Sequence, residues 1–320
     1  MLQTFWEGLG SRVAESWATA LVGPAFVFWA GGLLAWVTHF GAGDVAEKFL
    51  ELEGPLKIAL ILAVPAIVFL TTALQQPLIP AALRLLEGYW PDWCSIRVLL
   101  TTRQSNAIGQ AAAGWQALRL KGLDKLTDRE MQDYVRYDRA VKLAPAEGER
   151  MPTRLGNILR SAERRPTAKY GLDGVICWTR LWMLLPEAAK NDLSTSRSTL
   201  DSAVRTWMLG VLFMFWAAVS FVPGSFANTW TLWPLPAGFV AALLAYRWGL
   251  SAAEVYGDLI EAAYDLYRFA LYEALRWPLP AMTSNELLSG RQLTEYLLRG
   301  TVSPAVTFSA SKSPDPVAKG

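Results

Sequence analysis

The sequence predicts an all-α integral membrane protein with four transmembrane helices. Three long runs, residues 16–43, 58–83 and 206–246, contain no Lys, Arg, Asp or Glu. A bilayer core needs about 20 apolar residues per helix, so the first two runs suit one span each and the longer third run suits two. No stretch alternates apolar and polar residues for long enough to predict a strand. The hydrophobic content of 52% agrees with this class.

The turn between the last two spans is predicted by Pro223, Gly224 and Asn228. Residues 1–16 carry apolar side chains four positions apart, a pattern typical of an amphipathic helix at the membrane interface or of a helical extension of the first span. The apolar run of the first span is too long for a cleaved signal, and charged residues precede it. We expect the spans near residues 17–40, 57–80, 205–223 and 230–250.

The distribution of basic residues predicts the orientation. Residues 84–205 hold twenty Lys and Arg against fourteen Asp and Glu, whereas residues 44–57 hold two Lys and four acids. Basic segments stay in the cytoplasm, so we expect the middle segment and both termini to be cytosolic. The composition, rich in Ala, Leu and Trp, favours a bacterial inner membrane. The only cysteines, Cys94 and Cys177, lie in this middle segment, and we expect free thiols.

The middle segment is predicted to be a helical domain. Thr127 and Glu130 form a capping-box pattern at one helix start, and Pro166 is expected to end the helix that follows Pro152. The tail is small, polar and rich in proline, which favours disorder. The predicted parts are the interfacial lead-in 1–16, spans one and two in 17–83, the cytosolic helical domain 84–203, spans three and four in 204–250, a cytosolic helical extension 251–308 and the disordered tail 309–320.

Residues 251–277 follow the fourth predicted span without a clear breaker, which predicts one long amphipathic helix that ends near Pro278. Its acids recur in steps of four, three and four, so they share one helix face. Three interpretations are open: a solvated face, an ion-pair partner for the basic cluster in residues 150–169, or a carboxylate ring at the mouth of an oligomeric cation pore. The candidate vestibule residues are Glu254, Asp258, Glu261 and Asp265.

Two more sets of polar residues are candidates for binding or contact. Span two carries Thr and Gln pairs four apart, which suit helix contacts, a pore lining or an interfacial position: Thr71, Thr72, Gln75 and Gln76. The basic cluster suits capture of a phosphorylated ligand or anionic lipid headgroups, or pairing with nearby acids. Its candidate residues are Arg154, Arg160, Arg164 and Arg165.

Residue counts argue against an enzyme. His39 is the only histidine and falls at the outer end of the first span, so a histidine-dependent triad in the cytosolic part is excluded. A His/Cys zinc cluster and a phosphate-binding loop are also absent from the sequence. We expect no catalytic residue, no cofactor and no metal. Interleaved acids and bases argue against nucleic-acid binding.

Two function classes fit these patterns. The first is a homo-oligomeric membrane channel or pore-forming protein that is gated by the cytosolic helical domain. Cations are the permeant species that the acidic face would favour. The alternative is a membrane-anchored sensor or scaffold whose cytosolic domain binds a partner protein, for instance in a bacterial defence or envelope system. The expected partners are the lipid bilayer, a second copy, and a cytosolic protein or anionic lipid. The scarcity of charge within the spans argues against a proton-coupled transporter.

Overall fold

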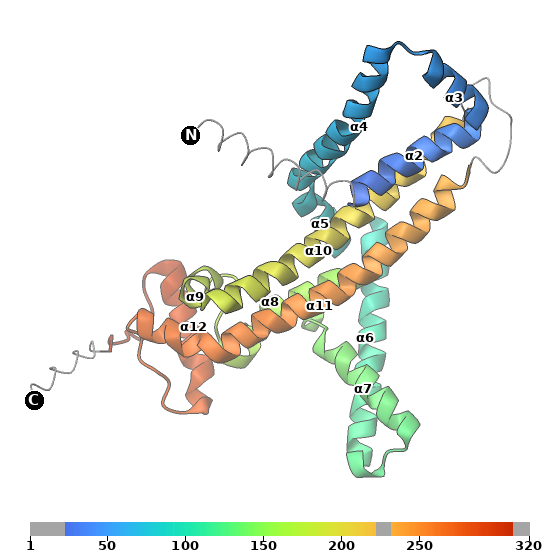
Figure 1. Ribbon diagram of the computed structural model, residues 1–320. Helices are drawn as coiled ribbons and strands as arrows, with labels where there is room; N and C mark the ends of the chain where they lie inside the picture. Colours follow the sequence, from blue (N-terminus) through green and yellow to red (C-terminus); the bar gives the residue numbers. More distant parts are fainter. Residues whose placement is uncertain (1–22, 92, 222–231, 310–320) are drawn as a thin grey trace, which may run out of the picture. The chain divides into compact units, whose positions relative to one another are not determined.

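The computed structural model describes residues 23–91, 93–221 and 232–309, and these form helices and connecting turns without a strand (Figure 1). The predicted all-helical class is therefore confirmed for the described residues. The chain divides into two compact units. Unit 1 comprises Met1–Arg84 and Thr199–Gly249, and unit 2 comprises Leu85–Ser198 and Leu250–Gly320. The lead-in 1–16, the turn near residue 224 and nearly all of the tail lie outside the described residues.

Unit 1 begins with helices separated by glycine and proline. The first, α2 (Pro24–Phe40), starts with proline, whose fixed φ suits a first helical turn. It ends at Gly41, where φ is 90°, a value that favours glycine. α3 (Ala42–Glu51) and α4 (Gly54–Gln75) follow. The short 3-10 turn η1 (Gln76–Leu78) contains Pro77 and joins α4 to α5 (Ile79–Glu87).

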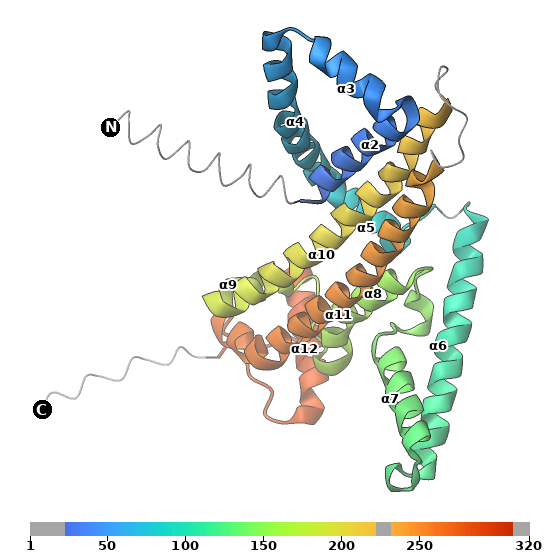
Figure 2. The same cartoon turned by 45° about the vertical axis from the view of Figure 1, so that its right-hand side comes forward.

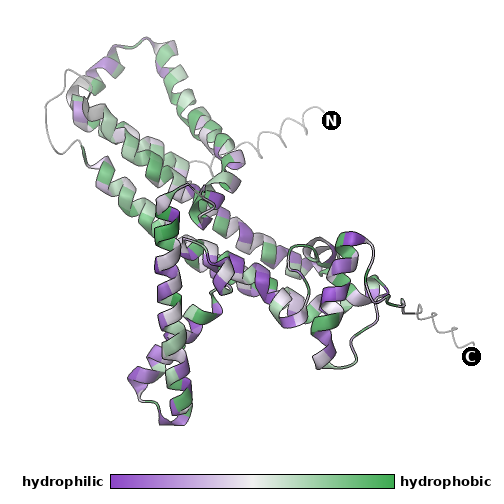
Figure 3. Cartoon of the chain, turned by 180° about the vertical axis from the view of Figure 1, so that it is seen from behind, coloured by the Kyte–Doolittle hydropathy of each residue, from purple (hydrophilic) through white to green (hydrophobic). Residues whose placement is uncertain are grey.

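The segment Gly54–Glu87 is long and apolar enough to cross a membrane. It contains the second predicted span, and α4 is hydrophobic along most of its length in Figure 3. Within the described residues it is the one helical segment with this property that has no sharp bend, and α2 together with part of α3 forms a second candidate that is bent by 104°. By length and composition the described residues thus contain one candidate span, whereas membrane localisation and the four-span arrangement stay predictions.

The remaining helices of unit 1 pack through small residues. The second half of α10 (Glu187–Phe213) lies against the first part of α11 (Pro234–Ala274), and their backbones approach closely at Gly210 and Gly238. A Cβ atom on Gly238 would lie 2.6 Å from the carbonyl oxygen of Gly210. Such close contacts between small residues are typical of helix pairs in membranes. α10 continues into η4 (Met214–Phe221), a 3-10 segment, where the third predicted span had been expected as α-helix.

Unit 2 contains a helical hairpin, α6 (Ser95–Lys121) and α7 (Asp128–Lys142), which lie side by side in both views (Figures 1 and 2). α6 ends at Gly122, and the 3-10 turn η2 (Leu123–Lys125) reverses the chain. The predicted capping box is present, because the Thr127 side chain and the Glu130 carboxylate each bond the backbone N–H of the other residue. The hairpin therefore has a closed turn and a capped second helix.

The core of unit 2 lies where α9 (Trp178–Leu184), α12 (Thr283–Arg299) and the start of α10 meet α11, and α8 (Arg154–Tyr170) packs beside it through Tyr170. Another 3-10 turn, η3 (Glu147–Glu149), precedes α8. The core includes the fully buried side chains of Leu172, Leu181, Tyr264, Leu271, Tyr272 and Leu293. The prediction that Pro166 ends its helix was wrong, because α8 continues to Tyr170 and ends at left-handed Gly171. Pro166 is buried, so tertiary packing outweighs the one lost backbone hydrogen bond.

The long helix predicted after the fourth span is present. α11 runs without interruption through Gly257 to Ala274, so the span-like first part and the acidic part belong to one helix. The chain then turns at Arg276, whose φ is 54°, and buries Trp277 in the core of unit 2. Cys94 and Cys177 are free thiols, as expected.

Candidate functional site

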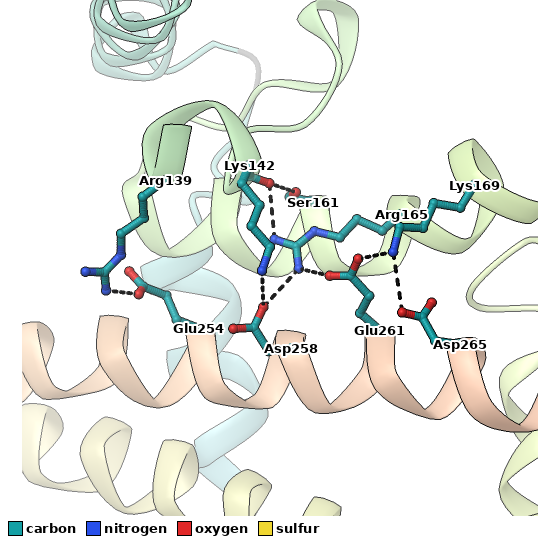
Figure 4. Close-up of polar contacts among 9 residues, drawn as sticks. All are labelled: Arg139, Lys142, Ser161, Arg165, Lys169, Glu254, Asp258, Glu261 and Asp265. Atoms are coloured by element: carbon teal, nitrogen blue, oxygen red, sulfur yellow. Dashed lines mark hydrogen bonds and ion pairs between the residues drawn. The ribbon is translucent and has the colours of Figure 1, made fainter. Parts of the chain in front are cut away.

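The four carboxylates of α11 lie within unit 2 and face basic residues of α7 and α8 (Figure 4). We call these four carboxylates the acidic stripe. Their spacing follows the helical repeat, so one face of α11 presents all four in a row. Cations recur on the two opposing helices at matching intervals: Arg139 and Lys142 are three residues apart, and Arg165 and Lys169 are four apart. The arrangement is an ion-paired contact between helices far apart in the chain.

The contacts from α7 involve the first half of the stripe. The Arg139 guanidinium donates to Glu254, whose side chain is largely buried at 12% exposure. The Lys142 Nζ donates to Asp258 Oδ1 at 3.1 Å. Both bonds join the hairpin to α11, and the backbone carbonyl of Lys142 also accepts a hydrogen bond from the Ser161 hydroxyl of α8 at 3.0 Å. The end of α7 is thereby fixed to both neighbouring helices.

The contacts from α8 involve the second half. Arg165 Nη1 lies 2.7 Å from Glu261 Oε2 and 3.2 Å from Asp258 Oδ1. Lys169 pairs with the same Glu261 carboxylate and lies 3.5 Å from Asp265. The Tyr170 hydroxyl donates to Asp265. Each carboxylate of the stripe therefore has at least one charged partner inside the chain.

Burial and charge together set the protonation states at the centre of the contact. Burial alone would raise the pKa of Glu261, but hydrogen bonds and charge from Lys169 and Arg165 outweigh it, so this pKa lies below its ordinary value of 4.5. The hydrogen bond to Glu261 raises the pKa of Lys169 above its ordinary value. Both groups are therefore charged at neutral pH.

The pairs differ in the stability that they supply. Exposed ion pairs contribute about 0–1 kcal/mol each, because water and salt screen them. The Arg165 and Glu261 side chains are only 11% and 15% exposed, so removal of one of them leaves the other poorly hydrated. We infer that this pair dominates the contact and that Lys142–Asp258, at about half exposure on each side, adds little.

The other arginines of the predicted anion cluster mostly have acidic partners. Arg160 pairs with Glu163, and Arg164 pairs with Glu149 at 2.7 Å and with Asp173 at 3.6 Å. Arg154, by contrast, is exposed at the start of α8, and none of the described residues forms an ion pair or hydrogen bond with its side chain. The cluster therefore splits, and only Arg154 leaves its charge unpaired among the described residues.

The polar residues of the second predicted span contact neighbouring helices of unit 1. Trp29 Nε1 donates to Thr71 Oγ1 at 2.8 Å, and Arg205 donates to Gln76 Oε1 at 2.8 Å. Thr72 donates to the backbone of its own helix. Gln75 is buried, and its amide finds no hydrogen-bond partner among the described residues. Thr71 and Gln76 thus act as contacts between helices, while a pore-lining role stays untested.

Sequence reasoning missed Arg139, Lys142 and Tyr170. Their spacing was visible, because Arg139 and Lys142 repeat at a helical interval near the end of a capped helix. Spacing alone does not say which helices pack together, and this was the missing information.

Among the described residues no group of three His, Cys, Asp or Glu side chains could hold a metal ion. No protein-family model, curated protein or solved structure matches the chain.

Proposed function

We propose that the chain is a membrane-anchored scaffold or sensor whose helical unit 2 binds a partner protein through the α6–α7 hairpin. One observation carries the choice over a channel: four cations of α7 and α8 face the four carboxylates of the acidic stripe. The formal charges of these eight groups cancel, so the stripe has little field left to concentrate cations. Its use is to hold α7 and α8 on α11.

The hairpin has the surface of a binding element. No residue of α7 is fully buried, and of the 27 residues of α6 only Ala111 is. Large apolar side chains stay exposed on both helices, among them Leu99, Met131 and Leu120, the last at 88% exposure. Ile96 and Leu99 are three residues apart and share one helix face, and neighbouring exposed apolar side chains of this kind mark interaction sites more often than scattered single ones do.

The hairpin is also internally braced, which preserves its shape for recognition. Trp115 Nε1 donates to Asp138 at 2.9 Å, and Lys121 pairs with Glu130 at 2.7 Å. A Cβ atom on Gly114 would lie 2.7 Å from the Tyr137 ring, so the two helices pack closely there. A pre-shaped helical pair loses little conformational entropy on binding.

Site-specific photocrosslinking in cells tests this proposal. A photoreactive residue would replace Leu99, Leu120 or Met131 on the hairpin, with Leu288 and Leu298 of α12 as exposed apolar controls in the same unit. We expect one adduct of defined mass at the hairpin positions and none at the controls. Mass spectrometry then separates a partner protein from a second copy of this chain. Equal labelling at hairpin and control positions would contradict the proposal.

A flux assay separates the two function classes. The purified protein in liposomes should pass no more cations than empty liposomes at low ionic strength. If it conducts, and if neutralising the acidic stripe lowers cation selectivity, the channel hypothesis replaces the scaffold.

A further inference from the structure

A groove of about 580 Å³ lies in unit 2 between α6, α7 and α8. Its volume falls in the range of about 300–1,000 Å³ that is usual for small-ligand sites. The groove is distinct from the apolar hairpin positions proposed to bind a partner, because its lining contains none of Leu99, Leu120 and Met131. It adjoins the acidic stripe through one shared residue, Arg139.

The lining combines positive charge with an apolar floor. Three arginines, Arg136, Arg139 and Arg154, lie on it, and its described lining contains no acid. Ile108 and Ile158 contribute apolar surface, as do several alanines. A ligand that fits both features carries a negative charge and a hydrocarbon part.

The arginines keep hydrogen-bonding capacity for a ligand. Arg154 has no ion-pair or hydrogen-bond partner among the described residues, and Arg136 pairs only with the half-buried Asp133 on its own helix, at 2.8 Å, and stacks over Tyr137. Arg139 donates one of its N–H groups to Glu254 and retains others. Guanidinium groups bind phosphate and carboxylate alike through paired N–H donors, so the three arginines suit an anionic group of either kind.

We propose that this groove binds an anionic phospholipid, with its phosphate on Arg136, Arg139 and Arg154 and part of one acyl chain on the floor. Charge complementarity and the apolar floor select an amphiphile over a free anion. The chain itself contains a helix long and apolar enough to span a membrane, so phospholipid is available to it. The basic cluster predicted from sequence thus contributes one residue, Arg154, and the hairpin contributes the other two. The proposal does not depend on a protein partner.

Native mass spectrometry of the detergent-solubilised full chain tests the site. The chain would be titrated with short-chain phosphatidylglycerol, with phosphatidylcholine of the same chain length, and with inorganic phosphate. We expect phosphatidylglycerol to bind at one site and the other two to bind at least tenfold more weakly. Equal binding of phosphatidylcholine would overturn the role of charge. Equal binding of inorganic phosphate would overturn the lipid in favour of a soluble anion.

Variants with matched controls locate the site. Arg154→Gln should weaken phosphatidylglycerol binding by at least about tenfold, the effect of one lost charge-assisted hydrogen bond. Arg299→Gln removes an exposed charge from α12 and should change nothing. Ala107→Trp fills the groove from an exposed position of α6, and Ala117→Trp is its control on the same helix. Unchanged binding in Arg154→Gln, or equal loss in the variant and its control, would overturn the proposal. Because Arg154 is exposed, its variant remains informative if Ala107→Trp does not fold.

Discussion

Replacing Glu261 by glutamine tests the energetic centre of the acidic stripe. The substitution keeps the size of the side chain and removes the charge that faces Arg165 and Lys169. Hydrogen bonds to charged groups contribute about 1.5–3 kcal/mol, and the neutral amide can still accept one weaker bond. The 11% exposure of Arg165 places the pair between surface and interior. We therefore expect a loss of about 2 kcal/mol in the free energy of unfolding.

The expected change in melting temperature follows from the size of unit 2, about 185 residues. For a domain of this size 1 kcal/mol shifts Tm by about 2–4 °C, so Glu261→Gln should lower Tm by about 4–8 °C. The assay is thermal unfolding of the full chain in detergent, followed by circular dichroism. Glu295→Gln, which removes the acid of an exposed i,i+4 pair with Arg299, should shift Tm by no more than about 1 °C.

A charge exchange separates the pair from other effects of the substitution. Glu261→Lys alone places a third cation beside Arg165 and Lys169 and should lower Tm further than Glu261→Gln. Addition of Arg165→Glu restores opposite charges and should recover part of the loss. If the Tm of Glu261→Gln equals that of the Glu295→Gln control, the stripe does not hold these helices together. The same conclusion follows if the charge exchange recovers none of the lost Tm.

Three further predictions concern pH, membrane insertion and thiol labelling. The pKa of Glu261 is lower in the folded state than its ordinary value of 4.5, so the charged carboxylate stabilises the fold above pH 4.5. This stabilisation is lost as pH falls through the folded-state pKa. The Tm difference between wild type and Glu261→Gln should therefore shrink in that acid range. Phe215→Lys should impair membrane insertion by about 2.5–3.5 kcal/mol on the insertion scale, whereas Ala227→Lys should cost little; equal effects would mean that the predicted turn is misplaced. In permeabilised cells a maleimide should label Cys94 quickly and Cys177 slowly, because burial raises the pKa of the Cys177 thiol to about 11. In intact cells an impermeant reagent should not reach Cys94, and labelling of Cys94 there would overturn the predicted orientation.

The sequence was most informative where one pattern decides one local structure. The capping box at Thr127 and the continuous helix through residues 251–274 follow from local periodicity, and both are present. The acids of α11 were also correctly placed on one face. Pro166 was misjudged, because its intrinsic cost is smaller than the packing of the helix around it.

Partners across the fold could not be predicted from the sequence. The spacing of the acids supported three interpretations of the acidic stripe equally. The residue pattern of a helix face is the same whether that face meets water, a second helix or the axis of an oligomeric pore. The choice depended on α7 and α8, whose residues lie about 90–120 positions away in the chain. In the same way, Arg154 and Arg165 belonged to one basic cluster in the sequence, yet one lines a groove and the other is ion-paired.

The central claim, that the acidic stripe holds the hairpin on α11, is tested most directly by a distance measurement within unit 2. Spin labels would be placed at the exposed positions Met131 of α7 and Val255 of α11, with Cys94 replaced by serine. We predict a narrow distance distribution in this background and a broad one after Glu254, Asp258, Glu261 and Asp265 are all neutralised to Gln or Asn. An unchanged distribution in the neutralised protein would contradict the claim.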